Sequence, residues 1–350
     1  MSMRSVLKKI TQPCAKNPPP GNANADHLAP IGQNCRDCFP RQSCAMITRP
    51  QKPSLWALLF AIRGTIVPAI WPKVLFTMLI SSVVVATHGK LFDYKVVLTA
   101  TPFTLWGLTL AIFLGFRNTV AYQRFWEART LWSELSIVTR NLTRQNLSMM
   151  PNLPSTERRA LLDSLIAFSY LLKDWLRGEK PGEDSCRLLE PALQRATFDK
   201  ENPPSVLLGL IGQRLMEQAR QSSIGDPLKA DMDQQLNRLS YVLGGCERIS
   251  NTPIPYPYIL MLHRIVHVYC FLLPFCLVDS IGWFTPFAVL VLAYTFFGLD
   301  ALGDQIADPF DTQPNDLPLN ALCRDIEISV LDMLDEPAPP RLEPVNDVQL

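Results

Sequence analysis

The sequence predicts an all-α membrane protein with four membrane-spanning helices in two hairpins and a helical region between the hairpins. Two regions of the 350 residues, near 74–116 and 258–303, are almost purely apolar, and each is long enough for two bilayer crossings. The region 117–250 is instead rich in Arg, Asp, Glu, Gln and Leu. No segment of useful length alternates apolar and polar residues as a half-buried strand does, so helices are expected throughout.

Residues 1–50 are rich in Pro, Asn and Gly and have neither a helical nor a strand period. Such a segment cannot bury enough apolar surface to order itself, so a disordered extension is expected. The first alternative is a metal site formed by Cys35, Cys38 and Cys44 together with Cys14 or His27. A complete zinc site needs a fourth ligand at suitable spacing and usually a second paired motif, which disfavours this alternative. The second alternative is that translation begins at Met46, where a coherent sequence starts.

Residues 51–127 are expected to form an interfacial helix and the first membrane hairpin. The segment 54–67 has the amphipathic pattern of a helix that lies along the membrane surface. A first span follows at about 74–87, or from Ile70, and a short loop leads to a second span at 99–116. The second span carries no charge, and Arg and aromatic residues follow it directly. This pattern is typical of a helix that leaves the bilayer and continues into water.

Residues 128–252 are expected to form a helical region outside the membrane. Apolar residues recur there close to the 3.6-residue helical period, and Pro151 and Pro154 end the first helix. Further helices are predicted at 156–177, 207–221 and 228–243. Asp226 before Pro227 is predicted to start the last of them, because an acceptor side chain followed by proline is a helix-start signature.

Residues 253–303 are expected to form the second membrane hairpin. Its proline-rich start forces an extended hinge, and two spans at 258–283 and 284–302 follow with a tight link between them. Residues 304–334 are expected to contain an amphipathic helix at 319–334. Residues 335–350 are rich in Pro and Glu and are predicted to be a disordered tail.

The charge of the chain is balanced, with 33 basic and 32 acidic residues, which excludes nucleic-acid binding by bulk electrostatics. Four spans return both termini and the helical region to one side of the membrane. Arg117, Arg124 and Arg129 after the second span mark that side as cytoplasmic by the positive-inside rule. The sequence contains no HExxH, GxSxG or GxxxxGK[ST] motif, so an enzyme is disfavoured and no cofactor is expected.

Three motifs in order resemble the bestrophin family, and specifically its bacterial branch. They are IFLGFRN with YQRFWEARTLW, then GGCERISNTPIPYPYILMLHR, then DPFDTQPNDLPLNALCRDIE. The likeness covers about 46–334, nearly the whole chain except its two ends. It implies a multi-pass ion channel of the bacterial inner membrane, built as a homopentamer with one pore on the five-fold axis. The expected partners are copies of the chain, the lipid bilayer and permeant monovalent ions.

The resemblance also implies a narrow pore neck on the second membrane helix, lined here by Leu108, Ile112 and Phe116. Their spacing of four places them on one stripe of a helix that drifts about 40° per step. Five copies would stack three apolar rings, which can gate a pore by dewetting. On periodicity alone, the same residues could be core or lipid-facing. The family's second constriction would fall near 224–228, with Ile224 as the candidate.

The sign of the permeant ion is left open, because the family conducts chloride in its name-giving members and cations in others. Calcium gates the animal members through an acidic run after the fourth span. In this chain the matching run, 308–316, has Thr, Gln and Asn at several of these positions, so calcium gating and a metal site are not expected. The alternative to a channel is a membrane scaffold or transporter subunit without channel activity.

Charged residues near the spans are expected to face protein or water, because a charge inside a bilayer is costly. Arg264 is predicted to pair with Glu127 or Asp308 at the cytosolic boundary. Arg117 and Asn118 are predicted to hold the second span against neighbouring helices rather than to line the pore.

Overall fold

The computed structural model describes residues 65–87, 90–91, 94–95 and 99–343, all within one compact unit, Ser43–Leu350. The predicted extension at 1–50, with its cysteines and Met46, lies outside the described residues, as does almost all of the predicted interfacial helix. Within the part that is described, the fold is all-α apart from two strands of two residues each, and the predicted fold class is confirmed in this respect.

The first membrane hairpin consists of α2 (Val67–Ala86) and the first half of α3 (Ala100–Met149). Helix α2 begins before residue 70, so its 20 residues are long enough to cross a bilayer. The link was predicted to be a plain loop. It contains β1 (Lys90–Leu91) and β2 (Tyr94–Lys95), which pair antiparallel.

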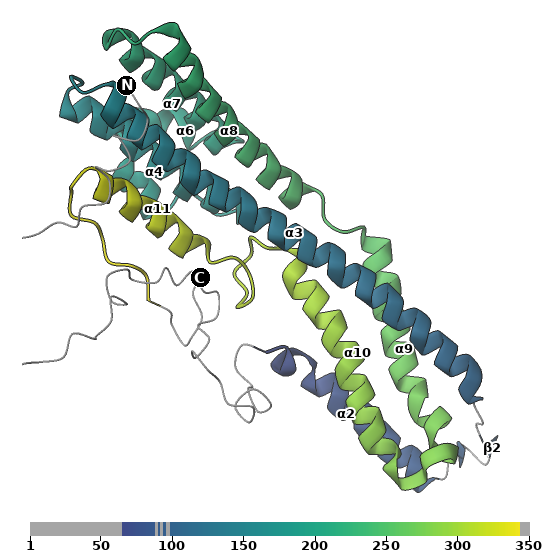
Figure 1. The fold of residues 1–350 in the computed structure, drawn as a ribbon. Coiled ribbons are helices and arrows are strands. Elements are labelled where there is room, and N and C mark those ends of the chain that lie inside the picture. Colours follow the sequence, from purple (N-terminus) through teal and green to yellow (C-terminus); the bar gives the residue numbers. More distant parts are fainter. Residues whose placement is uncertain (1–64, 88–89, 92–93, 96–98, 344–350) are drawn as a thin grey trace, which may run out of the picture. The chain divides into compact units, whose positions relative to one another are not determined.

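Helix α3 is one uninterrupted helix of 50 residues, about 75 Å long at 1.5 Å per residue. It passes through the predicted division between residues 127 and 128 without a break. Its first half packs against α9 and α10, and its second half packs against α8, α4 and α11 (Figure 1). The same helix therefore belongs to the membrane hairpins and to the helical region.

The helical region consists of α4 (Ser155–Leu176), α5 (Glu183–Leu188), α6 (Pro191–Thr197), α7 (Pro203–Gln221), α8 (Asp226–Asn251) and α11 (Leu319–Met333). The predicted helices are present, and the short α5 and α6 were not predicted because neither is long enough to show a period. Buried apolar side chains of these helices and of α3 form one core, which includes Trp132, Leu135 and Phe168.

The start of α8 differs from the prediction. Gly225 is the N-cap residue, and Asp226 is the first helical residue with no side-chain capping hydrogen bond. Asp226 instead forms an ion pair with Lys229, at 3.1 Å between Oδ1 and Nζ. Its negative charge still lies in the first turn, where the helix dipole favours it.

The second hairpin consists of α9 (Tyr256–Ile281) and α10 (Thr285–Ala307), joined by the 3-10 turn η2 (Gly282–Phe284). By length and composition, three described helical stretches can cross a membrane, and the third extends over 52 residues, Tyr256–Ala307. This stretch reverses at Gly282, which has the positive φ of 52° that glycine tolerates, and α9 then packs against α10. Four apolar helices result.

The first residues of the predicted C-terminal tail contact the helical region. Glu336 forms an ion pair with Arg159 of α4, and its backbone N–H donates to the Leu331 carbonyl at 3.1 Å. Arg341 lies 3.8 Å from Asp325 of α11.

Candidate functional site

The predicted neck residues lie on one exposed face of α3. Leu108, Ile112 and Phe116 are 59%, 49% and 62% exposed. The opposite face of the same turns is buried, with Leu110 and Leu114 inside the core of the membrane helices. Apolar side chains that a chain leaves exposed within a membrane helix face lipid, a neighbouring subunit or a pore. The pore role of these three residues remains a prediction.

Directly after Phe116, the buried face of α3 changes from apolar to charged. The Arg117 guanidinium is fully buried, and its Nη1 donates to Asp300 Oδ1 of α10 at 2.7 Å. The same nitrogen lies 3.3 Å from the backbone carbonyl of Asp300, and Nη2 donates to Asp304. This arrangement agrees with the prediction that Arg117 holds α3 against its neighbours.

A third helix contributes His263 to this cluster. Its Nδ1 lies 2.6 Å from Asp300 Oδ2 and its Nε2 lies 3.3 Å from Asp304 Oδ2. A doubly protonated His263 can donate to both carboxylates, and the cluster then has two positive and two negative charges. Because Arg117, His263 and the two aspartates come from α3, α9 and α10, the cluster ties together three membrane helices.

Asn118 adds a polar contact between α3 and α10. Its Nδ2 donates to the Leu299 carbonyl of α10 at 3.0 Å. Gly303 makes this approach possible, because a Cβ atom there would overlap the Asn118 amide and touch the Arg117 guanidinium. Helix α10 therefore needs a glycine where α3 places its two polar side chains.

Among the described residues, His263, Asp300 and Asp304 are the one group of three or more His, Cys, Asp or Glu side chains close enough to share an ion. The Arg117 guanidinium already occupies a position between the two carboxylates and donates to both. Since its positive charge compensates them, the donor set fits an ion-pair cluster rather than a metal site.

About two turns beyond Arg117 on α3, Arg124 binds the ends of two other helices. Its Nε donates to the Ala307 carbonyl at the end of α10, at 3.0 Å, and its Nη2 donates to the Ile249 carbonyl of α8 at 2.8 Å. Its Nη1 donates to the Thr252 carbonyl that follows α8. A guanidinium at two helix C-termini satisfies carbonyls that have no intrahelical partner and complements both helix dipoles.

The partners predicted for Arg264 are wrong. Glu127 forms its ion pair with Arg248 of α8, and Asp308 lies 3.9 Å from Arg124. Arg264 is exposed on α9, and none of the ion pairs found in the described part of the chain includes it. The sequence could not show which α9 side chain faces α3 and α10. That side chain is His263.

The candidate for the second constriction lies in the turn between α7 and α8. Ile224 is 7% exposed, packs in the core of the helical region, and donates its backbone N–H to the Ala219 carbonyl at 3.0 Å. Leu228, at the other end of the predicted range, is 45% exposed in the first turn of α8. The assignment of Ile224 to a constriction remains a prediction.

The acidic run at 308–316 forms the turn that connects α10 to α11. Asp308 and Asp311 are exposed, whereas Asp316 is 3% exposed and accepts the Gln313 N–H on Oδ2 at 2.7 Å. Burial raises the pKa of Asp316 to about 7, and the Asp311 and Asp308 carboxylates add to this rise. Its Oδ1 has no hydrogen-bond partner.

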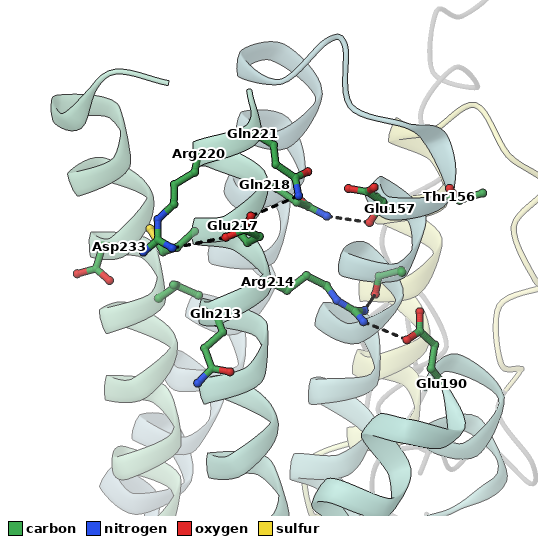
Figure 2. Close-up of a pocket in the computed structure, with 14 residues that line it drawn as sticks. Thr156, Glu157, Glu190, Gln213, Arg214, Glu217, Gln218, Arg220, Gln221 and Asp233 are labelled. Atoms are coloured by element: carbon green, nitrogen blue, oxygen red, sulfur yellow. Dashed lines mark hydrogen bonds and ion pairs between the residues drawn. The ribbon is translucent and has the colours of Figure 1, made fainter. Parts of the chain in front are cut away.

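The helical region contains a hollow of about 990 Å³ between α4, α7 and α8 (Figure 2). Four of its charged side chains form two ion pairs: Arg214 donates to Glu190 at 3.0 Å and Arg220 lies 3.5 Å from Glu217. Gln218 donates to the Glu157 carbonyl at 2.9 Å. Both arginines of the hollow are therefore already paired with carboxylates.

The sequence reasoning missed Asp300, Asp304 and His263 as members of one cluster. A signal was present, because the two aspartates are the only charged residues between 285 and 307 and are four apart, on one helix face. Two carboxylates on an apolar helix require a compensating positive charge. Arg117 is the first basic residue after the uncharged span 99–116.

Comparisons with known proteins identify the family of the chain. Residues 46–332 match the family model described as bacterial and fungal bestrophin protein. The voltage-dependent anion channel-forming protein mll4386 of Mesorhizobium japonicum is 40% identical over 87% of this chain and 97% of its own length. The voltage-dependent anion channel-forming protein YneE of Escherichia coli K12 is 37% identical over 87% of this chain and its full length.

Solved structures give the same result. A crystal structure of a bacterial bestrophin homolog from Klebsiella pneumoniae, obtained by Zn-SAD phasing, matches with 38% identity and a TM-score of 0.73. The match covers 77% of this chain and 99% of that chain. The fold, the family model and the curated relatives therefore agree, and the chain belongs to the bacterial and fungal bestrophin family.

Proposed function

We propose that this protein is a bestrophin-type channel in which five copies surround one axial pore and conduct small monovalent ions. The observation that carries the proposal is the division of α3 into two faces. Leu108, Ile112 and Phe116 are exposed on one face, while the other face is buried against α9 and α10. Because its other face packs against α9 and α10, α3 can present this apolar stripe to the five-fold axis.

The mechanism follows from the chemistry of these three side chains. Rings of leucine, isoleucine and phenylalanine offer no hydrogen bonds to water or ions, so a narrow neck lined by them conducts only while it is hydrated. The Arg117 cluster holds the helix at the end of this stripe. The neck therefore acts as a hydrophobic gate on a fixed support.

Apolar rings do not select the sign of an ion. The names of the relatives, voltage-dependent anion channel-forming proteins, support anions as the permeant species. Calcium is not required for opening. The protein resides in the bacterial inner membrane, with the helical region and both termini in the cytoplasm, because Arg117, Arg124 and Arg129 follow the second span within α3 and basic residues favour the cytoplasmic side.

The decisive experiment is a reversal-potential measurement with the purified full-length chain in planar bilayers under asymmetric potassium chloride. We expect single-channel currents that reverse near the chloride equilibrium potential and persist when calcium is chelated. Reversal near the potassium potential would overturn anion selectivity but not the channel. The absence of current from a correctly assembled particle would favour a scaffold or a transporter subunit.

The oligomeric state is tested separately by light scattering in detergent. Five chains of 39.4 kDa give a protein mass of about 197 kDa. A particle of any other stoichiometry would contradict the axial pore, whatever currents are recorded.

A further inference from the structure

A groove of about 390 Å³ lies between α2, α9 and α10, on the surface of the apolar helices. Most of its lining is apolar: Phe76 of α2, Val268, Phe271 and Leu272 of α9, and Phe297 of α10. Phe76, Val268 and Phe271 are 61%, 48% and 48% exposed, so the groove opens outward. Apolar walls that remain exposed on membrane helices face lipid or another apolar surface.

Two basic side chains, Lys73 and His267, lie among these apolar walls. Lys73 of α2 has its Nζ 5.9 Å from the centre of the Phe297 ring. The lysines that form ion pairs in the described part of the chain are Lys173 and Lys229, so Lys73 has no carboxylate partner there. An ammonium group within an apolar helix is costly unless an anion or water compensates it.

His267 of α9 is held in a defined orientation within the groove. Its Nδ1 donates to the His263 carbonyl at 2.7 Å, and its ring lies 5.0 Å from the Phe297 ring. The bond through Nδ1 leaves Nε2 for another partner. His267 is one helical turn, about 5.4 Å, from the His263 of the Arg117 cluster. The basic part of the groove is therefore close to the side of the membrane on which the helical region lies.

From this pairing we infer that the groove binds one anionic phospholipid, in the leaflet next to the helical region. The lipid phosphate would be bound by Lys73 and His267, and an acyl chain would lie along Phe76, Val268 and Phe271. Basic pockets between membrane helices on the cytoplasmic side are sites for anionic lipid headgroups. A lipid supplies both the charge that Lys73 lacks and the hydrocarbon that the walls require, whereas a soluble anion supplies only the first.

The test uses the purified full-length protein in detergent and follows its thermal unfolding. Dioleoyl phosphatidylglycerol is titrated against dioleoyl phosphatidylcholine, and inorganic phosphate is added in a third series. We expect stabilisation by phosphatidylglycerol and little by the other two. Lys73→Gln should raise the half-saturating concentration of phosphatidylglycerol about fivefold, the factor that corresponds to about 1 kcal/mol for one basic side chain near an anionic lipid.

Lys229→Gln is the matched control, because Lys229 lies in the helical region and already pairs with Asp226. It should leave the lipid titration unchanged. A second variant, Val268→Trp, fills the groove while keeping Lys73, and it should weaken stabilisation by phosphatidylglycerol as well. This variant keeps the inference testable if Lys73→Gln does not fold.

Several outcomes would overturn the inference. Equal stabilisation by phosphatidylcholine would show that the groove does not select charge, and full stabilisation by inorganic phosphate would identify a soluble anion. No effect of any lipid, together with a changed particle mass in Lys73→Gln, would show that a second copy of the chain covers the groove. None of these readouts depends on ion conduction.

Discussion

Arg117 of α3 and Asp300 of α10 form a buried ion pair, with 2.7 Å between Nη1 and Oδ1, directly after the last predicted neck residue. Both side chains are almost completely shielded from solvent. Asp304 and His263 complete the charge arrangement around them. Because Arg117 is adjacent to Phe116, any movement of α3 at the neck must either carry α10 with it or break this pair.

Arg117→Met is expected to destabilise the protein by about 3–5 kcal/mol, because it leaves two carboxylates of α10 without their main compensating charge. Thermal unfolding in detergent measures the loss as a lower transition temperature. The matched control is Arg220→Met, since Arg220 forms an exposed pair with Glu217 that should contribute less than about 1 kcal/mol. Equal effects of the two substitutions would contradict a dominant role for the buried cluster.

Replacement of Leu108, Ile112 and Phe116 by alanine together is expected to raise open probability and conductance severalfold, because smaller side chains leave a wider neck that holds water more readily. Single-channel recording measures both quantities. The control is Leu79→Ala with Val83→Ala, which shortens exposed apolar side chains of α2. Unchanged open probability and conductance in the triple variant would show that the neck lies elsewhere.

The sequence was sufficient to predict the long helices and their order, because each carries its own period and its own ends. The 18 uncharged residues at 99–116 and the periodic pattern after them already indicate a helix that enters and leaves the membrane. Helix α3 confirms that both parts are helical and shows that no loop separates them. The break at Pro151 and Pro154 is likewise a local signal.

Partners between helices could not be predicted in the same way. Whether His263 or Arg264 faces α10 depends on the rotation of α9 about its axis, which differs by about 100° between adjacent residues and is set by packing. The same applies to Ile224, whose burial follows from the turn between α7 and α8. The groove at Lys73 required three helices to be placed together, and no local pattern contains that information.

Arg124→Lys is expected to loosen the ends of α8 and α10 although it keeps the positive charge. An ammonium group cannot reproduce the planar fork with which Arg124 reaches the Ala307, Ile249 and Thr252 carbonyls. The loss of hydrogen bonds to a charged group corresponds to about 1.5–3 kcal/mol. Hydrogen–deuterium exchange should therefore become faster in the last turns of both helices.

Arg140→Lys provides a comparison for Arg124→Lys, because Arg140 lies on the same helix and donates to a single exposed hydroxyl, that of Ser136. Exchange at the ends of α8 and α10 should not change in this variant. If Arg124→Lys also left exchange there unchanged, the three carbonyl contacts would not be what holds these helix ends.

Asp316 should make the stability of the protein depend on pH, because burial raises its pKa to about 7. An aspartate in the unfolded chain titrates near 3.9. Between these two values the folded protein binds more protons than the unfolded chain, so the free energy of unfolding decreases as pH rises and levels off above about 7. The asparagine in Asp316→Asn does not ionise, so this decrease in the free energy of unfolding should be absent from the variant.

Thermal unfolding of Asp316→Asn and of the wild type at pH 5 and pH 8 measures this effect. From pH 5 to pH 8, the free energy of unfolding of the variant relative to that of the wild type should increase by up to about 3 kcal/mol. Each pH unit below the raised pKa is worth about 1.4 kcal/mol. Asp332→Asn, at an exposed position of α11, should give a difference that does not change with pH. Parallel pH profiles for Asp316→Asn and the wild type would mean that Asp316 is ionised in the folded protein throughout this range, and that its buried Oδ1 obtains compensation from water or a cation.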